Sequence, residues 1–217
     1  MEDRGISLRS PIFNFQPPFL ILNSSFLIPL VVYLATMAPS FTWAHWGADG
    51  GDFVAAAFGA QVPHPPGFPV YLVLARICAT VLWGDPAWRL HVLSALMAGG
   101  AAALVASMLR RKGVSVWLAL ASALTLAFAP LFWSQALITE VYTTAAFFTA
   151  LALFWREAPD GQYDFLVGLA AGLSMAVHLT TVLLAPVWLL TKSSSAPSSG
   201  PSRWQRWALW LGGCALG

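Results

Sequence analysis

Residues 39–69 read PSFTWAHWGADGGDFVAAAFGAQVPHPPGFP, and this stretch lies between two apolar segments of the chain. It contains two aspartates, Asp49 and Asp52, and two of the four histidines, His45 and His64, but no lysine or arginine. The whole chain is 58% hydrophobic and only 9% charged. Ionisable groups are costly beside a membrane, so a cluster of them in one loop indicates function. We therefore interpret this loop as the candidate active site.

The composition predicts an integral membrane protein with an all-α, multi-span helical bundle. Mean hydropathy is +0.70, and the 217 residues include 11 tryptophans and 14 phenylalanines. This balance excludes an ordinary soluble domain. Cys78 and Cys214 both lie in apolar runs and fit neither a disulfide framework nor a metal site. The chain has no Walker loop, dinucleotide fingerprint or nucleophile elbow, so soluble-enzyme chemistries gain no support.

Apolar runs lie at about 19–37, 69–83, 88–109, 114–131, 140–155, 163–191 and 204–217. If each run crossed the membrane once, the cations at 110–112 would lie opposite the N-terminal arginines, against the positive-inside rule. Two changes restore that rule. The short run with Arg76 at its middle is expected to lie in the interface, and the 163–191 run, too long for one untilted span, is expected to break near His178. Nine of the eleven Lys and Arg residues then become cytoplasmic.

The resulting organisation has four parts. Residues 1–18 form a cytoplasmic N-terminus, and residues 19–191 form a membrane-embedded module whose catalytic outer loop is 39–87. A Ser-, Gly- and Pro-rich cytoplasmic linker follows at 192–203, before the start of a further span at 204–217. The N-terminus is interpreted as a retained signal anchor. Because the last run is too short to cross a core of about 30 Å, we expect the sequence to be the N-terminal part of a longer protein.

This topology brings scattered ionisable residues to one outer face. They are Asp49, Asp52, His64, Arg76, Arg89, Glu140 and His178. At such a face a carboxylate can take a proton from a hydroxyl nucleophile, while arginines neutralise a phosphate leaving group. The combination suits glycosyl transfer from a lipid-phosphate sugar.

Structural roles are open for the residues of the loop. Asp49 is suited to cap the helix predicted through DFVAAAFGA, with Asp52 as an acid in its first turn. One cap is enough, however, and the neighbouring glycines leave room for other groups to approach. His64 is equally consistent with a rigid proline-bounded turn.

The remaining candidates also have structural alternatives. Arg76 is able to snorkel, and Arg89 to anchor the interface beside Trp88. Glu140 is placed to start a helix, and His178 is equally consistent with a satisfied core histidine. His45, His91 and most tryptophans are assigned to an interfacial belt or to packing, whereas Trp43 and Trp46 stay open as sugar or lipid platforms.

Four segments resemble the successive motifs of one membrane protein family. They are GADGGDFVAAAFGAQVPHPPGFPVYLVLARI, GDPAWRLHVLSAL, FWSQALITEVYT and GLAAGLSMAVHLT. The family is catalogued as domain of unknown function 2723 and is related to a eukaryotic transmembrane protein O-mannosyltransferase. The layout is also similar, more distantly, to the GT-C glycosyltransferases. The resemblance covers about residues 39–185.

Most positions match the family pattern. Asp49 stands at the first acid, and His64, Arg89, Glu140 and His178 match motif positions. Asp52 stands where the family usually has Glu, and Val177 stands where Asn is expected.

The resemblance implies a GT-C-type glycosyltransferase that moves a hexose, with mannose favoured, from a polyprenyl-phosphate donor to a protein or glycan acceptor on the extracytoplasmic or luminal face. Asp49 is then the candidate base, positioned by Asp52. Arg76 or Arg89 binds the donor phosphate, while Glu140, His64 and His178 shape the pocket. Partners are membrane lipid, the lipid-linked sugar and the acceptor. No cofactor is firmly implied, no residue is assigned as a metal ligand, a requirement for a divalent metal stays open, and no nucleic-acid partner is expected.

Two other classes of function stay open. A transporter or lipid carrier also has broken segments and buried ionisable residues, but it should place them near the midplane and show internal repeats. An inactive truncated scaffold would bind the donor or a partner without turnover. Two lysines against nine arginines favour a bacterial plasma membrane; a eukaryotic protein is expected in the endoplasmic reticulum.

Overall fold

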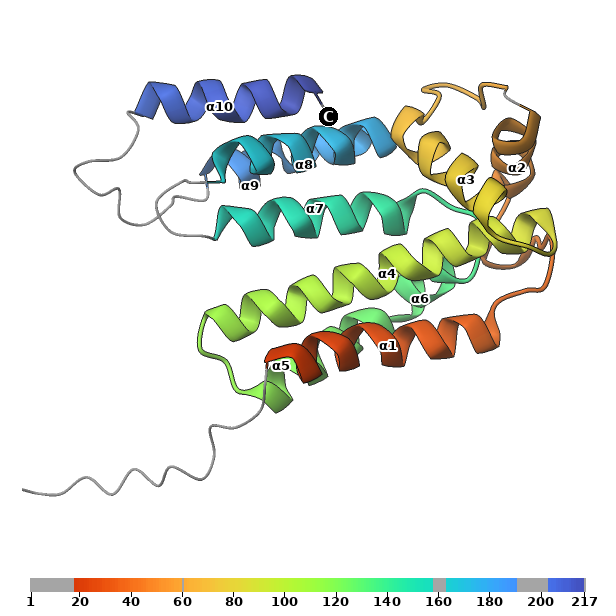
Figure 1. Ribbon diagram of the computed structural model, residues 1–217, viewed down its shortest axis with the longest axis horizontal. Coiled ribbons are helices and arrows are strands. Elements are labelled where there is room, and N and C mark those ends of the chain that lie inside the picture. The colour runs from red at the N-terminus through yellow and green to blue at the C-terminus, as the bar shows by residue number, and fades with distance from the viewer. Residues whose placement is uncertain (1–17, 60, 158–162, 191–202, 217) are drawn as a thin grey trace, which may run out of the picture.

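The computed structural model describes residues 18–59, 61–157, 163–190 and 203–216 (Figure 1). Its elements are α1 (Pro18–Thr36), the 3₁₀ helix η2 (Ala44–Trp46), α2 (Gly50–Gly59), α3 (Pro69–Val81), α4 (Pro86–Arg111), α5 (Val116–Ala127), α6 (Pro130–Ala136), α7 (Tyr142–Arg156), α8 (Asp164–Val177), the 3₁₀ helix η4 (Leu179–Leu184), α9 (Ala185–Leu190) and α10 (Arg203–Leu216). Over the described residues there is no strand, which confirms the expected all-α class.

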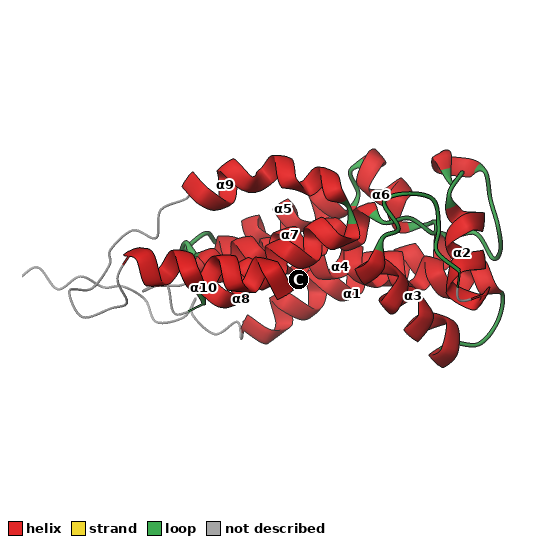
Figure 2. Ribbon diagram, turned by 90° about the horizontal axis from the view of Figure 1, so that it is seen from above, coloured by secondary structure: helices red, strands yellow, loops and turns green. Residues whose placement is uncertain are grey.

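The long helices lie side by side and run along one common direction (Figures 1 and 2). Helix α4 contacts α1, α5 and α7, and α8 contacts α7 and α10. The short helices α2 and α3 pack against one another and against the start of α4, so they gather at one end of the bundle. We call this end, which also carries the α6–α7 loop and His178, the loop end.

The central helix α4 has clear local start and stop signals. Asp85 caps its N-terminus, because Oδ1 accepts hydrogen bonds from the backbone N–H groups of Ala87, at 2.8 Å, and Trp88, at 3.3 Å. Oδ2 of the same carboxylate accepts the Ser40 hydroxyl at 2.7 Å, which joins the helix start to the loop after α1. The helix ends in Arg110 and Arg111, cations that suit a helix C-terminus.

The apolar core is continuous with the loop end. Phe53 of α2, Tyr71 of α3, Leu90 of α4 and Val177 of α8 belong to one buried cluster, together with Val141 before α7. Burying a large side chain of this kind stabilises a fold by about 1.5–3 kcal/mol. Packing therefore fixes the positions of five chain segments whose polar residues face the candidate site.

Membrane-spanning length is evident for one helix by itself. Of the described helices, α4 alone is long and apolar enough to cross a membrane, and α5 with α6 meets the same criterion as a pair bent by 68°. The expected 114–131 run is thus mainly α5, and it ends just after the bend, where Pro130 is the first residue of α6.

The expected break near His178 is present. Helix α8 ends at Val177, and His178 has an extended backbone with φ −152° and ψ 112°. The chain then turns back through η4 and α9 (Figures 1 and 2). The predicted N-terminal segment 1–18 and linker 192–203 lie outside the described residues, apart from residues 18 and 203.

Helices α8 and α10 approach at backbone distance. A Cβ added to Gly172 would lie 2.6 Å from the carbonyl oxygen of Cys214 and 3.0 Å from its Cα. A Cβ on Gly213 would lie 2.5 Å from the backbone nitrogen of Leu169. Only glycine fits at these two contacts, because real Cβ atoms essentially never approach so closely.

Candidate active site

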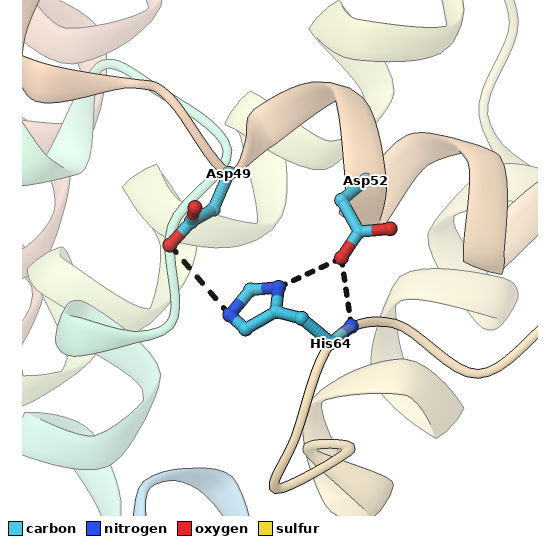
Figure 3. A network of polar contacts seen from close by, with 3 residues as sticks. All are labelled: Asp49, Asp52 and His64. Atoms are coloured by element: carbon cyan, nitrogen blue, oxygen red, sulfur yellow. Dashed lines mark hydrogen bonds and ion pairs between the residues drawn. The ribbon is translucent and has the colours of Figure 1, made fainter.

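The two aspartates of the loop lie at the start of α2. The Asp49 carbonyl accepts the first helical hydrogen bond from the Phe53 N–H at 3.0 Å, so Asp49 occupies the N-cap position. Asp52 lies in the first turn, as the capping interpretation expects. Both carboxylates also point toward one side chain across the loop, that of His64 (Figure 3). Asp49 therefore holds the N-cap position by its backbone, while its carboxylate faces His64.

His64 lies between the two carboxylates. Its ring Nδ1 is 2.7 Å from Asp52 Oδ2, and its backbone N–H donates to the same oxygen at 2.9 Å. Its Nε2 is 3.8 Å from Asp49 Oδ2. The side chains are 40% (His64), 49% (Asp49) and 44% (Asp52) exposed, so a substrate from solution can reach all three.

The Asp52 carboxylate is ionised at neutral pH. Its pKa lies below the ordinary value, first because of the backbone hydrogen bond from His64 and then because of the bond from the ring. A carboxylate in this state accepts hydrogen bonds only.

Aromatic rings hold the histidine in place. The Phe53 and Phe68 rings lie 5.8 Å and 5.2 Å from the His64 ring, centroid to centroid. The Gly67 N–H donates to the His64 carbonyl at 3.1 Å and closes the turn that the sequence predicts. Phe68 has a left-handed backbone with φ 47°, which is uncommon for a bulky residue and typical of functional loops.

Glu140 lies beneath this cluster, in the loop between α6 and α7. It is only 3% exposed. Burial, followed by the nearby charge of Asp49, raises its pKa to about 7. The Ser94 hydroxyl of α4 accepts the Glu140 N–H at 3.4 Å and fixes the loop. Glu140 is thus a third carboxyl of the site, and it exchanges its proton near neutral pH.

The late histidine also reaches the site, through aromatic contacts. The His178 ring lies 6.1 Å from the Phe68 ring and 5.2 Å from the Tyr142 ring. Its Nδ1 is within hydrogen-bond distance of Thr180 Oγ1, at 2.5 Å. Residues that are more than a hundred positions apart in the chain therefore meet at the loop end.

The two predicted arginines bind backbone carbonyls, not the carboxylates of the site. Arg76 donates to the Gln61 carbonyl at 3.2 Å and to the Ala56 carbonyl at 3.5 Å, which ties α3 to the end of α2. Arg89 donates from Nε to Gly84 and from Nη1 to the Ala79 carbonyl, at 3.0 and 2.8 Å. Within the described part of the chain, neither guanidinium contacts a carboxylate of the site.

Two tyrosines that the sequence analysis did not identify also belong to the site. Tyr142 lies against His178, and the charges of Glu140 and Asp49 reach its hydroxyl. Tyr71 is fully buried, its hydroxyl has no hydrogen-bond partner, and it lies within electrostatic range of Glu140. Both tyrosines lie inside the quoted motifs: Tyr142 is two residues after Glu140, and Tyr71 is five residues before Arg76. This placement is the sequence signal that could have identified them.

An apolar cavity of about 360 Å³ opens beside the site, between α4, α7 and η4. Tyr142 and His178 line it, and it extends along α7 to Leu153, about 16 Å at 1.5 Å per residue. Its other apolar lining includes Val105, Met108 and Leu184. Among the described residues, no group of three or more His, Cys, Asp or Glu side chains could hold a metal ion.

The comparisons with known proteins agree on one family. The family model described as Protein O-mannosyl-transferase TMEM260 N-terminal domain matches residues 49–197. The chain belongs to this family. The matched region of the TMEM260 N-terminal domain family begins at Asp49 and contains every predicted site residue, together with Tyr71 and Tyr142.

Two relatives carry the same name. Protein O-mannosyl-transferase tmem260 of Dictyostelium discoideum is 26% identical over 132 residues, which are 59% of this chain and 16% of that protein. Protein O-mannosyl-transferase TMEM260 of Mus musculus is 30% identical over 146 residues, 63% of this chain and 21% of that protein. The chain thus spans about a fifth of the length of these relatives. No solved structure matches it.

Proposed function

We propose that this chain carries the catalytic outer loop of a multi-pass membrane glycosyltransferase of GT-C type. It moves a hexose, with mannose favoured, from a polyprenyl-phosphate donor to a protein or glycan acceptor on the extracytoplasmic or luminal face. The observation that carries the proposal is the pair of half-exposed carboxylates facing one imidazole, with a buried third carboxyl beneath them. The names of both relatives support mannose and a protein acceptor.

Asp49 is the candidate base. Its carboxylate is 49% exposed, so an acceptor hydroxyl can approach within hydrogen-bond distance. Asp49 takes the hydroxyl proton while the acceptor oxygen bonds to the anomeric carbon of the sugar. The bond from that carbon to the phosphate oxygen breaks, and the lipid phosphate leaves with the electron pair.

The donor needs a cation for its phosphate and an apolar site for its lipid. Arg89 uses Nε and Nη1 for backbone carbonyls, and Nη2 makes neither of these bonds. This nitrogen, or the Arg76 guanidinium, is the proposed phosphate ligand. The apolar cavity along α7 supports a lipid-linked donor, because its lining includes Tyr142 and His178 next to the carboxylates.

The distribution of charge favours an enzyme over a transporter. Asp49, Asp52 and Glu140 gather at one end of the bundle. Transporters instead place their ionisable residues near the middle of the membrane, between repeated halves.

The test is transfer of radiolabelled hexose from a panel of polyprenyl-phosphate sugars in membranes containing the protein. Asp49→Asn should lower transfer at least about 100-fold, since general-base catalysis contributes roughly 10²–10⁴-fold. The matched control is Glu157→Gln at the opposite end, which should transfer at the wild-type rate. Full activity of Asp49→Asn would remove the mechanism. Absence of transfer from every donor by the inserted, stable wild type would remove the function.

A further inference from the structure

The two aspartates make unequal contacts with His64. Asp52 Oδ2 accepts both the backbone N–H and ring Nδ1 of this histidine. Asp49 faces the opposite ring nitrogen, Nε2, at 3.8 Å, which is beyond a direct hydrogen bond. Asp52 therefore contacts His64, and Figure 3 draws no contact between Asp52 and Asp49, the residue that it was expected to position.

The contact with Asp52 determines which ring nitrogen carries the proton. An ionised carboxylate accepts but does not donate, so the Nδ1 that it contacts must bear the hydrogen. In the neutral imidazole, Nε2 then has a free lone pair. That lone pair faces Asp49, the proposed base.

We propose that His64 is the proton acceptor for Asp49 and that Asp52 is a positioning residue acting only through His64. The inference rests on the proposed glycosyl transfer. In the first step the proton of the acceptor hydroxyl moves to Asp49 as the glycosidic bond forms and the lipid phosphate leaves. In the second step the same proton moves from Asp49 to Nε2 of His64. Asp49 is again a carboxylate, and His64 is an imidazolium with a carboxylate on each side.

The surroundings suit this second step. An imidazolium at this position has a carboxylate beside each ring nitrogen, Asp52 at Nδ1 and Asp49 at Nε2. The 3.8 Å gap can close to hydrogen-bond distance once Asp49 carries the proton, because a protonated carboxyl donates to the Nε2 lone pair. With donor and acceptor seated over Asp49, His64 is the neighbour through which the proton leaves.

The titratable groups that face His64 come from three places. Asp49 and Asp52 lie at the start of α2, Glu140 acts on it from the α6–α7 loop, and His178 follows α8 across the Phe68 ring. The experiment must therefore separate His64 from Glu140, a buried carboxyl whose raised pKa makes it a second candidate to hold the proton.

The first measurement is the rate of sugar transfer in wild type, His64→Gln, Asp52→Asn, the His64→Gln/Asp52→Asn double variant and Glu140→Gln. His64→Gln should be about 10- to 100-fold slower than the wild type, because Asp49 then has no acceptor for its proton. Asp52→Asn should cause no further loss in the His64→Gln background, because Asp52 acts only through His64.

Two outcomes of that measurement overturn the proposal: an unchanged rate in His64→Gln, whatever the rate of Glu140→Gln, or a further loss when Asp52→Asn is added to His64→Gln. A second measurement does not depend on turnover. The ¹⁵N imidazole shifts of histidine-labelled protein, with His64 assigned by its loss in His64→Gln, should show a protonated Nδ1 that changes in Asp52→Ala. A protonated Nε2 would overturn the relay even in an active enzyme. An Nδ1–H signal in a protein that transfers no sugar would instead identify the proposed function as the failure.

Discussion

The two ends of the bundle differ in how their carboxylates are paired. At the end away from the site, Glu157 is paired with Lys112 at 2.7 Å, and Asp164 with Arg156 at 3.8 Å. At the loop end, Asp49 and Asp52 face a histidine, Asp85 caps a helix, and Glu140 is buried. In the described part of the chain, none of these four carboxylates pairs with lysine or arginine. Neutralised pairs stabilise a fold, whereas carboxylates left without a cation stay available to take protons.

The largest expected effect is the pH dependence of folding stability that Glu140 causes at the loop end. Its pKa is raised to about 7 in the folded protein, above the ordinary 4.5. The folded state therefore holds a proton that the unfolded state releases, and stability is lost as pH rises from about 4.5 to 7. The full loss is about 3 kcal/mol at 1.36 kcal/mol per pKa unit. Glu140→Gln should abolish this decline in thermal unfolding of detergent-solubilised protein.

Two variants sharpen that experiment. Asp49→Asn removes the charge that helps to raise the Glu140 pKa, so its decline should be smaller than in the wild type. Glu157→Gln, at the opposite end, is the matched control and should decline as the wild type does. Equal declines in the wild type and Glu140→Gln would show that another group sets the pH dependence.

The next largest effect is expected at the opposite end. Arg156→Ala leaves the buried Asp164 without its nearby guanidinium and should lower the free energy of unfolding by about 1–3 kcal/mol. Sugar transfer per folded molecule should not change, because the pair lies far along the bundle from His64. Arg110→Ala, which removes an exposed cation bonded to a nearby carbonyl, is the control. A fall in turnover with unchanged stability would contradict the division between the ends.

The smallest effect is expected for Lys112→Ala. The Lys112 and Glu157 side chains are 61% and 28% exposed, and solvent-exposed pairs of this kind contribute roughly 0–1 kcal/mol. Unfolding at low and high salt should differ by less in the variant than in the wild type, because salt screens the pair. A loss above about 2 kcal/mol would mean that Lys112 has a further structural role.

Much of the architecture could be predicted from the lengths of apolar runs and the positions of cations. The positive-inside rule required a break in the last long run, and the structure has it at His178. The same rule gathered Asp49, His64 and Glu140 at one end, where they do lie together. Run length alone did not reveal the 68° bend between α5 and α6, because the apolar run continues from α5 through the break into the first residues of α6.

The finer contacts of the site depend on packing that no local pattern contains. Arg76 and Arg89 bind carbonyls at the ends of α2 and α3, and only the folded chain shows how close those ends are. The Asp52–His64 contact joins residues twelve positions apart, on either side of a loop. In the sequence, Tyr71 resembles an ordinary core residue. Only the folded chain shows that its hydroxyl lies within electrostatic range of the buried Glu140.

The glycine contacts between α8 and α10 bear on how sequence variants should be interpreted. Gly172 and Gly213 lie well away from His64 in the chain and carry no chemistry, yet a single added methyl group would meet backbone at 2.5–2.6 Å. An alanine at either position would separate two helices instead of altering the site. Such a variant is expected to lower the amount of folded protein while leaving turnover per molecule unchanged. Its abundance should therefore be measured before its activity.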